Sequence, residues 1–219
     1  MKQLKHTNLN QIIPSQTRTT FFHQNIQDLH SRKEPLEFIL DEINPNFIVL
    51  TEHNMTETEL QTFSLSNFSV TSHFCRTTTS GGGVVILSEV GLKAKNLPCK
   101  EVEELCQDKL FECCVAKIYL RSKKVVLAGI YRKPQMQNSD FLNRLNKLLE
   151  ILNGRENFVI VMGDFNINIL NHNLSEVRSL KNILRSHSMH YLIDFPTRVT
   201  ASTSTGIDNI ITNLAQSKT

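Results

Sequence analysis

A buried strand with a polar exit is the feature that most constrains this chain. Residues 157–166 read NFVIVMGDFN, and the apolar run Val159–Met162 predicts a strand that is covered on both faces. Gly163 permits a tight exit from that strand. Asp164 and Asn166 then share one side of the extended chain. A carboxylate and a carboxamide fixed at a strand end suit a site that grips a phosphate or its attacking water.

Composition indicates a globular chain. Of the 219 residues, 40% are hydrophobic and 21% are charged, which is enough apolar material for a core. The formal charge of +3 identifies no partner by itself, although it is compatible with nucleic acid if Lys and Arg gather on one face. Neither a secretory leader nor a run of apolar residues long enough to span a membrane is present, so we expect an intracellular protein, with the nucleus as one location. The cysteines form an odd set without a CxxC pair, which favours reduced, structural thiols: Cys75, Cys99, Cys106, Cys113 and Cys114.

The hydrophobic periodicity changes along the chain from mixed to strand-like and back. Residues 1–18 are polar and aperiodic, and we expect a loose tail there. A strand at 19–23, a helix opened by a capping box at Ser31–Glu34, and a strand at 47–51 follow in order. Last come the remaining expected elements: strands at 68–73, 83–88, 92–96, 111–120, 124–131, 157–162, 191–194 and 207–212, with helices at 139–152 and 175–187.

Helix-rich ends around a strand-rich centre predict an α/β fold of two stacked sheets with helices outside. No repeat or linker divides the chain, so we expect one domain over residues 19–219.

Polar residues follow directly after several of these buried strands. Any one such stretch is an ordinary strand-to-loop junction, but all of them in this order are informative together. They are Gln24-Asn25-Ile26, Leu50-Thr51-Glu52-His53, Ile130-Tyr131-Arg132-Lys133-Pro134, Gly163-Asp164-Phe165-Asn166 and, opening a strand, Gly206-Ile207-Asp208-Asn209.

These stretches resemble the endonuclease/exonuclease/phosphatase superfamily, and within it the endonuclease domains of non-LTR retrotransposons. The similarity covers about residues 19–213. It is carried by the Asn25 and Glu52 stretches, GGGVVIL at 81–87, IYRKP at 130–134, GDFN at 163–166, and PTRVT through IDNIIT at 196–212. The resemblance implies a four-layer α/β sandwich of two stacked mixed β-sheets with helices on both outer faces. It also implies Mg²⁺-dependent phosphodiester cleavage, with Mn²⁺ as an alternative ion.

The resemblance assigns a role to each matching side chain. Glu52 matches the carboxylate that holds the metal, with Asn25 beside it, and oxygen ligands suit a hard divalent ion. Asp164 matches the residue that orients or deprotonates the attacking water. Asn166 would steady that water and a phosphate oxygen, and Tyr131 would donate a hydrogen bond to the scissile phosphate. Substrate contacts fall to Arg132, Arg198 and Thr200.

One expected partner is missing from the sequence. In the family, the residue matching Asp208 holds a histidine in a later Ser-Asp-His segment, whereas here no histidine follows His190. The C-terminal end therefore reads as truncated, and Asp208 is expected to lack the imidazole that it should orient. Loss of a positioned acid–base group costs about 10²–10⁴-fold in rate, which predicts a weak or inactive nuclease.

Three hypotheses follow for function. The leading one is a DNA-nicking domain that normally lies upstream of a reverse transcriptase in a longer parent protein. A second keeps the phosphodiesterase or phosphatase chemistry and changes the substrate to a phosphoinositide, a lipid headgroup or RNA. The third is a catalytically decayed copy that only binds or has no role. The histidines are scattered without metal-ligand spacing, and only His53, beside Glu52, has a position that suits the metal site.

Overall fold

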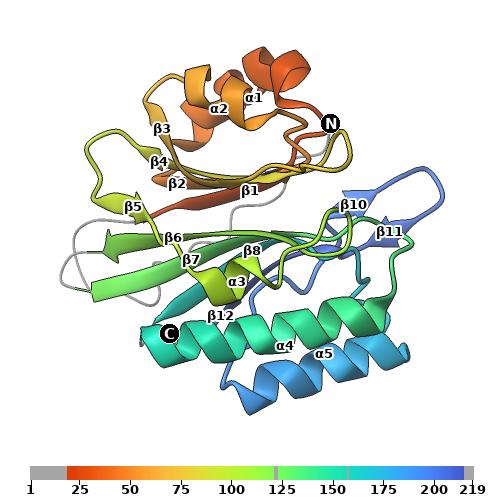
Figure 1. The fold of residues 1–219 in the computed structure, drawn as a ribbon. Coiled ribbons are helices and arrows are strands. Elements are labelled where there is room, and N and C mark those ends of the chain that lie inside the picture. Colours follow the sequence, from red (N-terminus) through yellow and green to blue (C-terminus); the bar gives the residue numbers. More distant parts are fainter. Residues whose placement is uncertain (1–18, 121–122, 157, 215–219) are drawn as a thin grey trace.

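The chain folds into four layers. The structure is a computed structural model, and it describes residues 19–120, 123–156 and 158–214. Two helices, α1 (Leu29–Ile43) and α2 (Glu57–Thr62), cover a four-stranded sheet, and α4 (Asn138–Arg155) and α5 (Ser175–Ser186) cover a six-stranded sheet (Figure 1). The two sheets face each other between the helical layers, which confirms the predicted sandwich. The expected tail at 1–18 lies outside the described residues, and the domain count stays a prediction.

The smaller sheet has the strand order β1-β2-β4-β3. Its strands are β1 (Phe21–Asn25), β2 (Phe47–Thr51), β3 (Phe68–Phe74) and β4 (Val84–Glu89). β1 and β2 are parallel because α1 returns the chain between them, while the other pairs are antiparallel. The first two strands therefore end at the same edge of the sheet.

The larger sheet has the strand order β5-β6-β7-β8-β12-β9. Its strands are β5 (Ala94–Asn96), β6 (Glu112–Leu120), β7 (Lys123–Tyr131), β8 (Val159–Asp164), β12 (Asp208–Thr212) and β9 (His190–Tyr191). β7 and β8 are parallel, with α4 as the connection, and β12 runs antiparallel to β8. A hairpin of β10 (Arg198–Val199) and β11 (Ser204–Thr205) projects just before β12 (Figure 1).

Three apolar cores separate the four layers. The sequence of β8 is apolar throughout because both faces of the strand are buried. Val159 and Val161 pack toward α4 and α5, while Ile160 and Met162 pack between the sheets. Cys113 and Cys114 divide in the same way, as expected for adjacent residues of a strand. The cysteines are all free thiols. In the part of the chain that is described, no helix combines the length and the apolar character needed to cross a bilayer.

Several element boundaries differ from the sequence prediction. α1 begins at Leu29, because the side chain of Asp28 accepts the backbone N–H of His30 and caps the helix before Ser31. A reciprocal capping box instead opens the short α2, where Thr56 and Glu59 bond each other's backbone. β9 is shorter than the strand expected at 191–194. Three further elements were not predicted from the sequence: α2, α3 (Lys100–Glu103) and the β10–β11 hairpin.

Candidate active site

The polar stretches found in the sequence meet at one end of the two sheets. β1, β2, β7 and β8 all terminate there, and β12 starts there. The register places Asn25 opposite Thr51 in one sheet, and Tyr131 and Asp208 on either side of Asp164 in the other. Side chains at strand ends are held rigidly by the sheet, and in open α/β sheets ligands bind beyond the carboxyl ends of the strands.

Asn25 links the two sheets by a forked hydrogen bond. Its Nδ2 donates to Glu52 Oε1 at 2.7 Å and to Asp164 Oδ2 at 3.0 Å. The network fixes the orientation of this amide, because a flipped amide would present its oxygen to two carboxylates. The carboxylates at positions 52 and 164 thus lie around one shared donor. Glu52 adopts a left-handed backbone conformation, φ 56°, which an L-residue adopts at a cost of about 1–2 kcal/mol.

The same network leaves an oxygen that suits a cation. Asn25 Oδ1 is buried and has no hydrogen-bond partner among the described residues. Buried acceptors are normally satisfied by a donor, a water or an ion. Glu52 and Asn25 Oδ1 could therefore supply two oxygen ligands of the kind that Mg²⁺ prefers. Among the described residues, no group of three or more His, Cys, Asp and Glu side chains is arranged to hold a metal, so an ion here would depend on waters and substrate oxygens as well.

Asp164 is a buried carboxyl group with a strongly shifted pKa. Its Oδ1 accepts the backbone N–H of Asn166 at 2.9 Å, and its Oδ2 accepts from Asn25. Burial, followed by the charge of Asp208, raises the pKa of Asp164 to about 7, while the bonds from Asn25 and Asn166 and the charge of His23 act in the opposite direction. A carboxylate whose pKa lies close to neutral pH is suited to act as a general base.

Asp208 is paired with an imidazole, contrary to the expectation from sequence. His23 Nε2 lies 3.1 Å from Asp208 Oδ1, and His23 Nδ1 lies 3.0 Å from the carbonyl oxygen of Val49. Both ring nitrogens face acceptors, and both side chains are buried. The family resemblance implies this partner after β12, whereas the fold supplies it from β1. Side-chain alternation along β1 could have indicated this partner, because it places His23 on the same strand face as Asn25.

The Tyr131 hydroxyl contacts Glu52, the candidate metal ligand. Its hydroxyl is hydrogen-bonded to Glu52, and burial, then the charge and hydrogen bond of Glu52, raise the pKa of Tyr131 far above its usual range. The hydroxyl therefore keeps its proton at physiological pH and remains a donor.

Arg132 and Asn166 hold the loop that follows β8. Arg132 is 3% exposed, and its guanidinium donates to the carbonyl oxygens of Phe165, Met136 and Asn166 at 2.6–2.7 Å. We expected Arg132 to contact substrate, but the side chain is buried and each of its three nitrogens donates to a backbone carbonyl oxygen. Asn166 has φ 49°, and its Nδ2 donates to the carbonyl oxygen of Arg132 at 2.7 Å. The loop carrying Asp164 is thus closed by reciprocal bonds.

His53 is a structural residue and not a metal ligand. Its Nε2 lies 3.1 Å from the carbonyl oxygen of Phe74, and its Nδ1 accepts the backbone N–H of Met55. Burial lowers the pKa of His53 to about 4, so the ring is neutral. Behind it, Gly83 has φ 88°, and a Cβ there would lie 2.1 Å from His53 Nε2. Gly81, Gly82 and Gly83 therefore pack closely beneath Glu52, and we call these three residues the glycine platform. The backbone N–H of Glu52 donates to the carbonyl oxygen of Gly83.

A buried ion pair that the sequence did not indicate supports this platform. Arg76 Nε donates to Glu112 Oε1 at 2.6 Å, and Glu112 Oε2 accepts the N–H of Gly83 at 2.6 Å. Glu112 lies opposite Tyr131 in the β6–β7 register, and the Arg76 guanidinium lies 5.9 Å from the centre of the Tyr131 ring. The pair therefore connects the glycine platform to the tyrosine.

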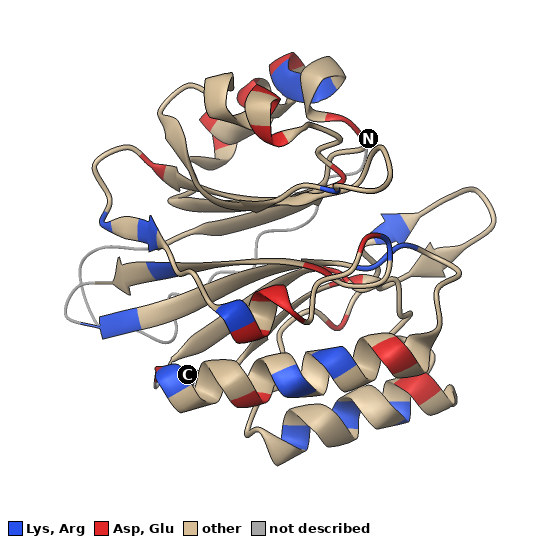
Figure 2. Ribbon diagram, in the orientation of Figure 1, with Lys and Arg blue, Asp and Glu red and all other residues tan. Residues whose placement is uncertain are grey.

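The two remaining predicted contacts lie on the projecting hairpin. Arg198 and Thr200 are exposed, and neither is hydrogen-bonded to the carboxylate cluster in the described residues. Thr200 instead bonds Thr203 within the turn. The Thr197 hydroxyl, which no sequence pattern indicated, accepts the N–H groups of Ile207 and Asp208 at 3.2 Å each and so fixes the start of β12. Lys and Arg occupy both helical layers and several strand ends instead of one face (Figure 2).

Comparison with known proteins identifies the architecture. The endonuclease domain of TRAS1, a telomere-specific non-LTR retrotransposon, matches with a TM-score of 0.63 and 14% identity over 86% of this chain and 82% of that chain. The chain has the endonuclease/exonuclease/phosphatase fold. D. rerio TDP2 complexed with single strand DNA product shares this fold, with a TM-score of 0.61 and 12% identity over 91% of this chain and 84% of that one. The Neisseria 3′ phosphatase NExo bound to product DNA hairpin shares it too, with a TM-score of 0.59 and 14% identity over 88% and 84%. No protein-family model matches the sequence, and no curated protein does.

Proposed function

We propose that this chain is a Mg²⁺-dependent phosphodiester hydrolase that nicks DNA, with low turnover, and that it is the endonuclease part of a retrotransposon protein. The observation that carries the proposal is the fork from Asn25 Nδ2 to Glu52 and Asp164. It gathers, at one strand edge, an oxygen pair for a hard cation and a carboxylate of near-neutral pKa. Those are the groups that hydrolysis of a phosphodiester requires.

The residues divide the reaction between them. Asp164 accepts a proton from a water, whose oxygen forms a bond to phosphorus while the bond from phosphorus to the leaving oxygen breaks. The carboxamide oxygen of Asn166 orients that water, since its Nδ2 is held by Arg132. The Tyr131 hydroxyl, whose single proton is directed at Glu52 in the free chain, turns to donate to a phosphoryl oxygen as negative charge develops there. Mg²⁺, when bound by Glu52 and Asn25 Oδ1, would stabilise negative charge on the phosphate oxygens.

Protonation of the leaving oxygen sets the expected rate. The only imidazole paired with Asp208 among the described residues is His23, and both of its ring nitrogens are engaged inside the protein. The leaving oxygen must then take its proton from water. We therefore expect turnover about 10²–10⁴-fold below that of a site with a positioned general acid.

DNA is the proposed substrate because two of the matched structures contain DNA. A reverse transcriptase in the same parent protein is the proposed partner, by analogy with the retrotransposon domain of matching fold. Mn²⁺ would serve in place of Mg²⁺, since both ions accept carboxylate, carbonyl and water oxygens. Binding without cleavage, and cleavage of other phosphoesters, are the outcomes that the experiment must separate.

The test is nicking of supercoiled plasmid with Mg²⁺ or with EDTA, run beside release of phosphate from inositol phosphates. We expect slow nicking that EDTA abolishes, that Asp164→Ala removes, and that Asp194→Ala retains, because Asp194 is an exposed carboxylate outside the site. Nicking that survives Asp164→Ala would contradict the proposal. Phosphate release without nicking would show that the substrate is a phosphoester other than DNA. DNA binding without either reaction would show that the chain binds DNA without cleaving it.

A further inference from the structure

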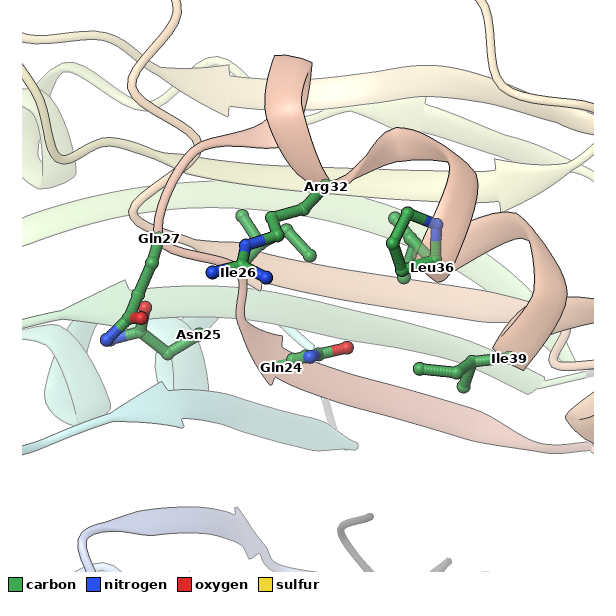
Figure 3. A pocket seen from close by; sticks show the side chains of 8 residues that line it. Gln24, Asn25, Ile26, Gln27, Arg32, Leu36 and Ile39 are labelled. Carbon is green, nitrogen blue, oxygen red and sulfur yellow. The ribbon is translucent and has the colours of Figure 1, made fainter. Parts of the chain in front are cut away.

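Lysine side chains gather at the end of the large sheet that lies away from the proposed hydrolytic centre. The centre is at the other end, where Tyr131 ends β7 and Asn25 ends β1 (Figure 3). Since β7 is nine residues long, its two ends lie about 26 Å apart. Figure 2 shows blue segments on β5, β6 and β7 at the lysine-rich end. We call these residues the lysine patch: Lys93, Lys95, Lys117, Lys123 and Lys124.

The strand register holds these like charges close together. Lys95 stands directly opposite Lys117 in the β5–β6 ladder, and Lys124 stands opposite Tyr119 in the β6–β7 ladder. Lys117 and Tyr119 share one face of β6, so all of these side chains lie on the same side of the sheet. Like charges directly opposite each other destabilise a sheet. An anion that binds here would therefore relieve repulsion that the free chain carries.

Few carboxylates offset the charge of the lysine patch. Glu156 pairs with Lys117. Glu89, which lies four residues before Lys93, accepts a hydrogen bond from Asn46. Within the described ranges, no ion pair joins a carboxylate to the other four lysines of the patch, and all four are exposed: Lys93, Lys95, Lys123 and Lys124. The patch thus presents unpaired positive charge to solvent.

Two of the ammonium groups are held over aromatic rings. Lys93 Nζ lies 4.6 Å from the centre of the Tyr119 ring, and Lys123 Nζ lies 4.7 Å from the centre of the Phe158 ring. Such contacts restrict a lysine side chain but leave its positive charge in place. A side chain that is already restricted loses less conformational entropy when it binds an anion. The patch therefore combines concentrated charge with partly preorganised side chains.

We propose that the lysine patch is a second nucleic-acid surface, which binds the phosphate backbone of a segment outside the hydrolytic centre. Lysine acts on phosphate as a point charge, and backbone contacts carry no sequence information, so binding here is independent of base sequence. Release of counterions from the nucleic acid supplies the affinity. The choice of nucleic acid among polyanions rests on the proposed function, because the other end of the sheet acts on a phosphodiester.

The test measures how binding depends on salt. Fluorescence anisotropy in EDTA, where no cleavage occurs, would give the Kd of labelled oligo-dT and of a DNA duplex, each about 30 nucleotides long, between about 50 and 200 mM NaCl. The patch variant carries Lys93→Gln, Lys95→Gln, Lys123→Gln and Lys124→Gln. It should reduce the slope of log Kd against log salt by about 2–4, because each lost phosphate contact removes about 0.7–0.9. The smaller double variant Lys95→Glu, Lys124→Glu should reduce the slope too, and urea unfolding checks that both variants fold.

The matched control removes the same number of positive charges from the helices. It carries Lys33→Gln, Lys100→Gln, Lys147→Gln and Lys181→Gln, all outside the patch. Its slope should change by less than about 1. Equal slope losses in the patch variant and this control would overturn the proposal, since binding would then follow net charge alone. An unchanged slope in the patch variant would overturn it as well. So would patch-dependent binding to phosphatidylserine vesicles without any change in the oligonucleotide Kd, because the patch would then be a membrane surface.

Nicking separates this inference from the proposed function. The patch variant should nick a short duplex at the wild-type rate, because its substitutions lie at the far end of β7 from Tyr131. Nicking by the wild-type chain, with equal salt slopes in the wild type and the patch variant, would refute the patch alone. Patch-dependent binding by a chain that never nicks would refute the proposed hydrolysis alone.

Discussion

His23 and Asp208 form a buried pair although 185 residues separate them in the chain, with His23 Nε2 3.1 Å from Asp208 Oδ1. Asp208 also stands opposite Asp164 across the β8–β12 ladder. The pair thus places an imidazole and a second carboxyl group next to the proposed general base. Its two members act on Asp164 in opposite directions, since Asp208 raises the pKa of that carboxyl group and His23 lowers it.

Opposite pH shifts are expected from substitutions in this pair. Asp164 must be ionised to accept a proton, so activity should rise with pH through the pKa of Asp164, about 7, or below it when Mg²⁺ is bound. Asp208→Asn removes a negative neighbour, lowers that pKa and moves the rising limb to lower pH. His23→Ala removes the opposing charge and moves the limb to higher pH. The readout is the pH dependence of nicking, and shifts of the same sign would contradict this account of the pair.

Arg132 is expected to act through the loop that it holds. In Arg132→Lys a single ammonium nitrogen replaces three guanidinium nitrogens that each bond a different carbonyl oxygen, so we predict a loss of about 2–4 kcal/mol in the free energy of unfolding and a lower kcat. Urea unfolding and single-turnover nicking would measure the two effects. Lys133→Ala is the control, because the neighbouring Lys133 side chain is exposed. If Arg132→Lys changed KM alone, Arg132 would be a substrate contact after all.

The glycine platform makes a prediction about stability. Gly83→Ala combines a left-handed φ of 88° with a Cβ only 2.1 Å from His53 Nε2, so it should cost about 2–4 kcal/mol. Gly91→Ala has a similar φ of 93° but meets no atom within 4 Å, and should cost only about 1–2 kcal/mol. Chemical denaturation of both variants isolates the contact with His53. Equal losses would show that His53 moves aside freely.

Tyr131→Phe tests the hydroxyl without disturbing the core. The ring is buried between the sheets, and Phe keeps it. Removal of one donor to the developing phosphate charge should lower kcat by about 10²-fold with little change in the free energy of unfolding. Full activity in this variant would restrict the hydroxyl to its contact with Glu52.

The sequence predicted those parts of the site that depend on strand ends. An apolar run such as Val159–Met162 specifies a strand buried on both faces, and the residue after it must then emerge at the sheet edge. Asn25, Glu52, Tyr131 and Asp164 were found in this way, and the fold brings them together.

Other contacts depend on tertiary geometry that local patterns do not encode. Arg132 follows a strand end, where side-chain alternation no longer applies, and its guanidinium turns inward over the Phe141 ring. His23 was one of several scattered histidines until the two sheets stacked and placed it against Asp208. The start of α1 shifted because Asp28, with φ 112°, provided an earlier cap than Ser31.

The most direct test of the central claim is a crystal structure of the chain soaked with Mn²⁺, read by anomalous scattering. We expect one peak bound by the Glu52 carboxylate and Asn25 Oδ1, on the side of the fork that also carries Asp164. A structure without a peak there, or one in which the carboxyl groups of Glu52 and Asp164 open onto separate surfaces, would contradict it.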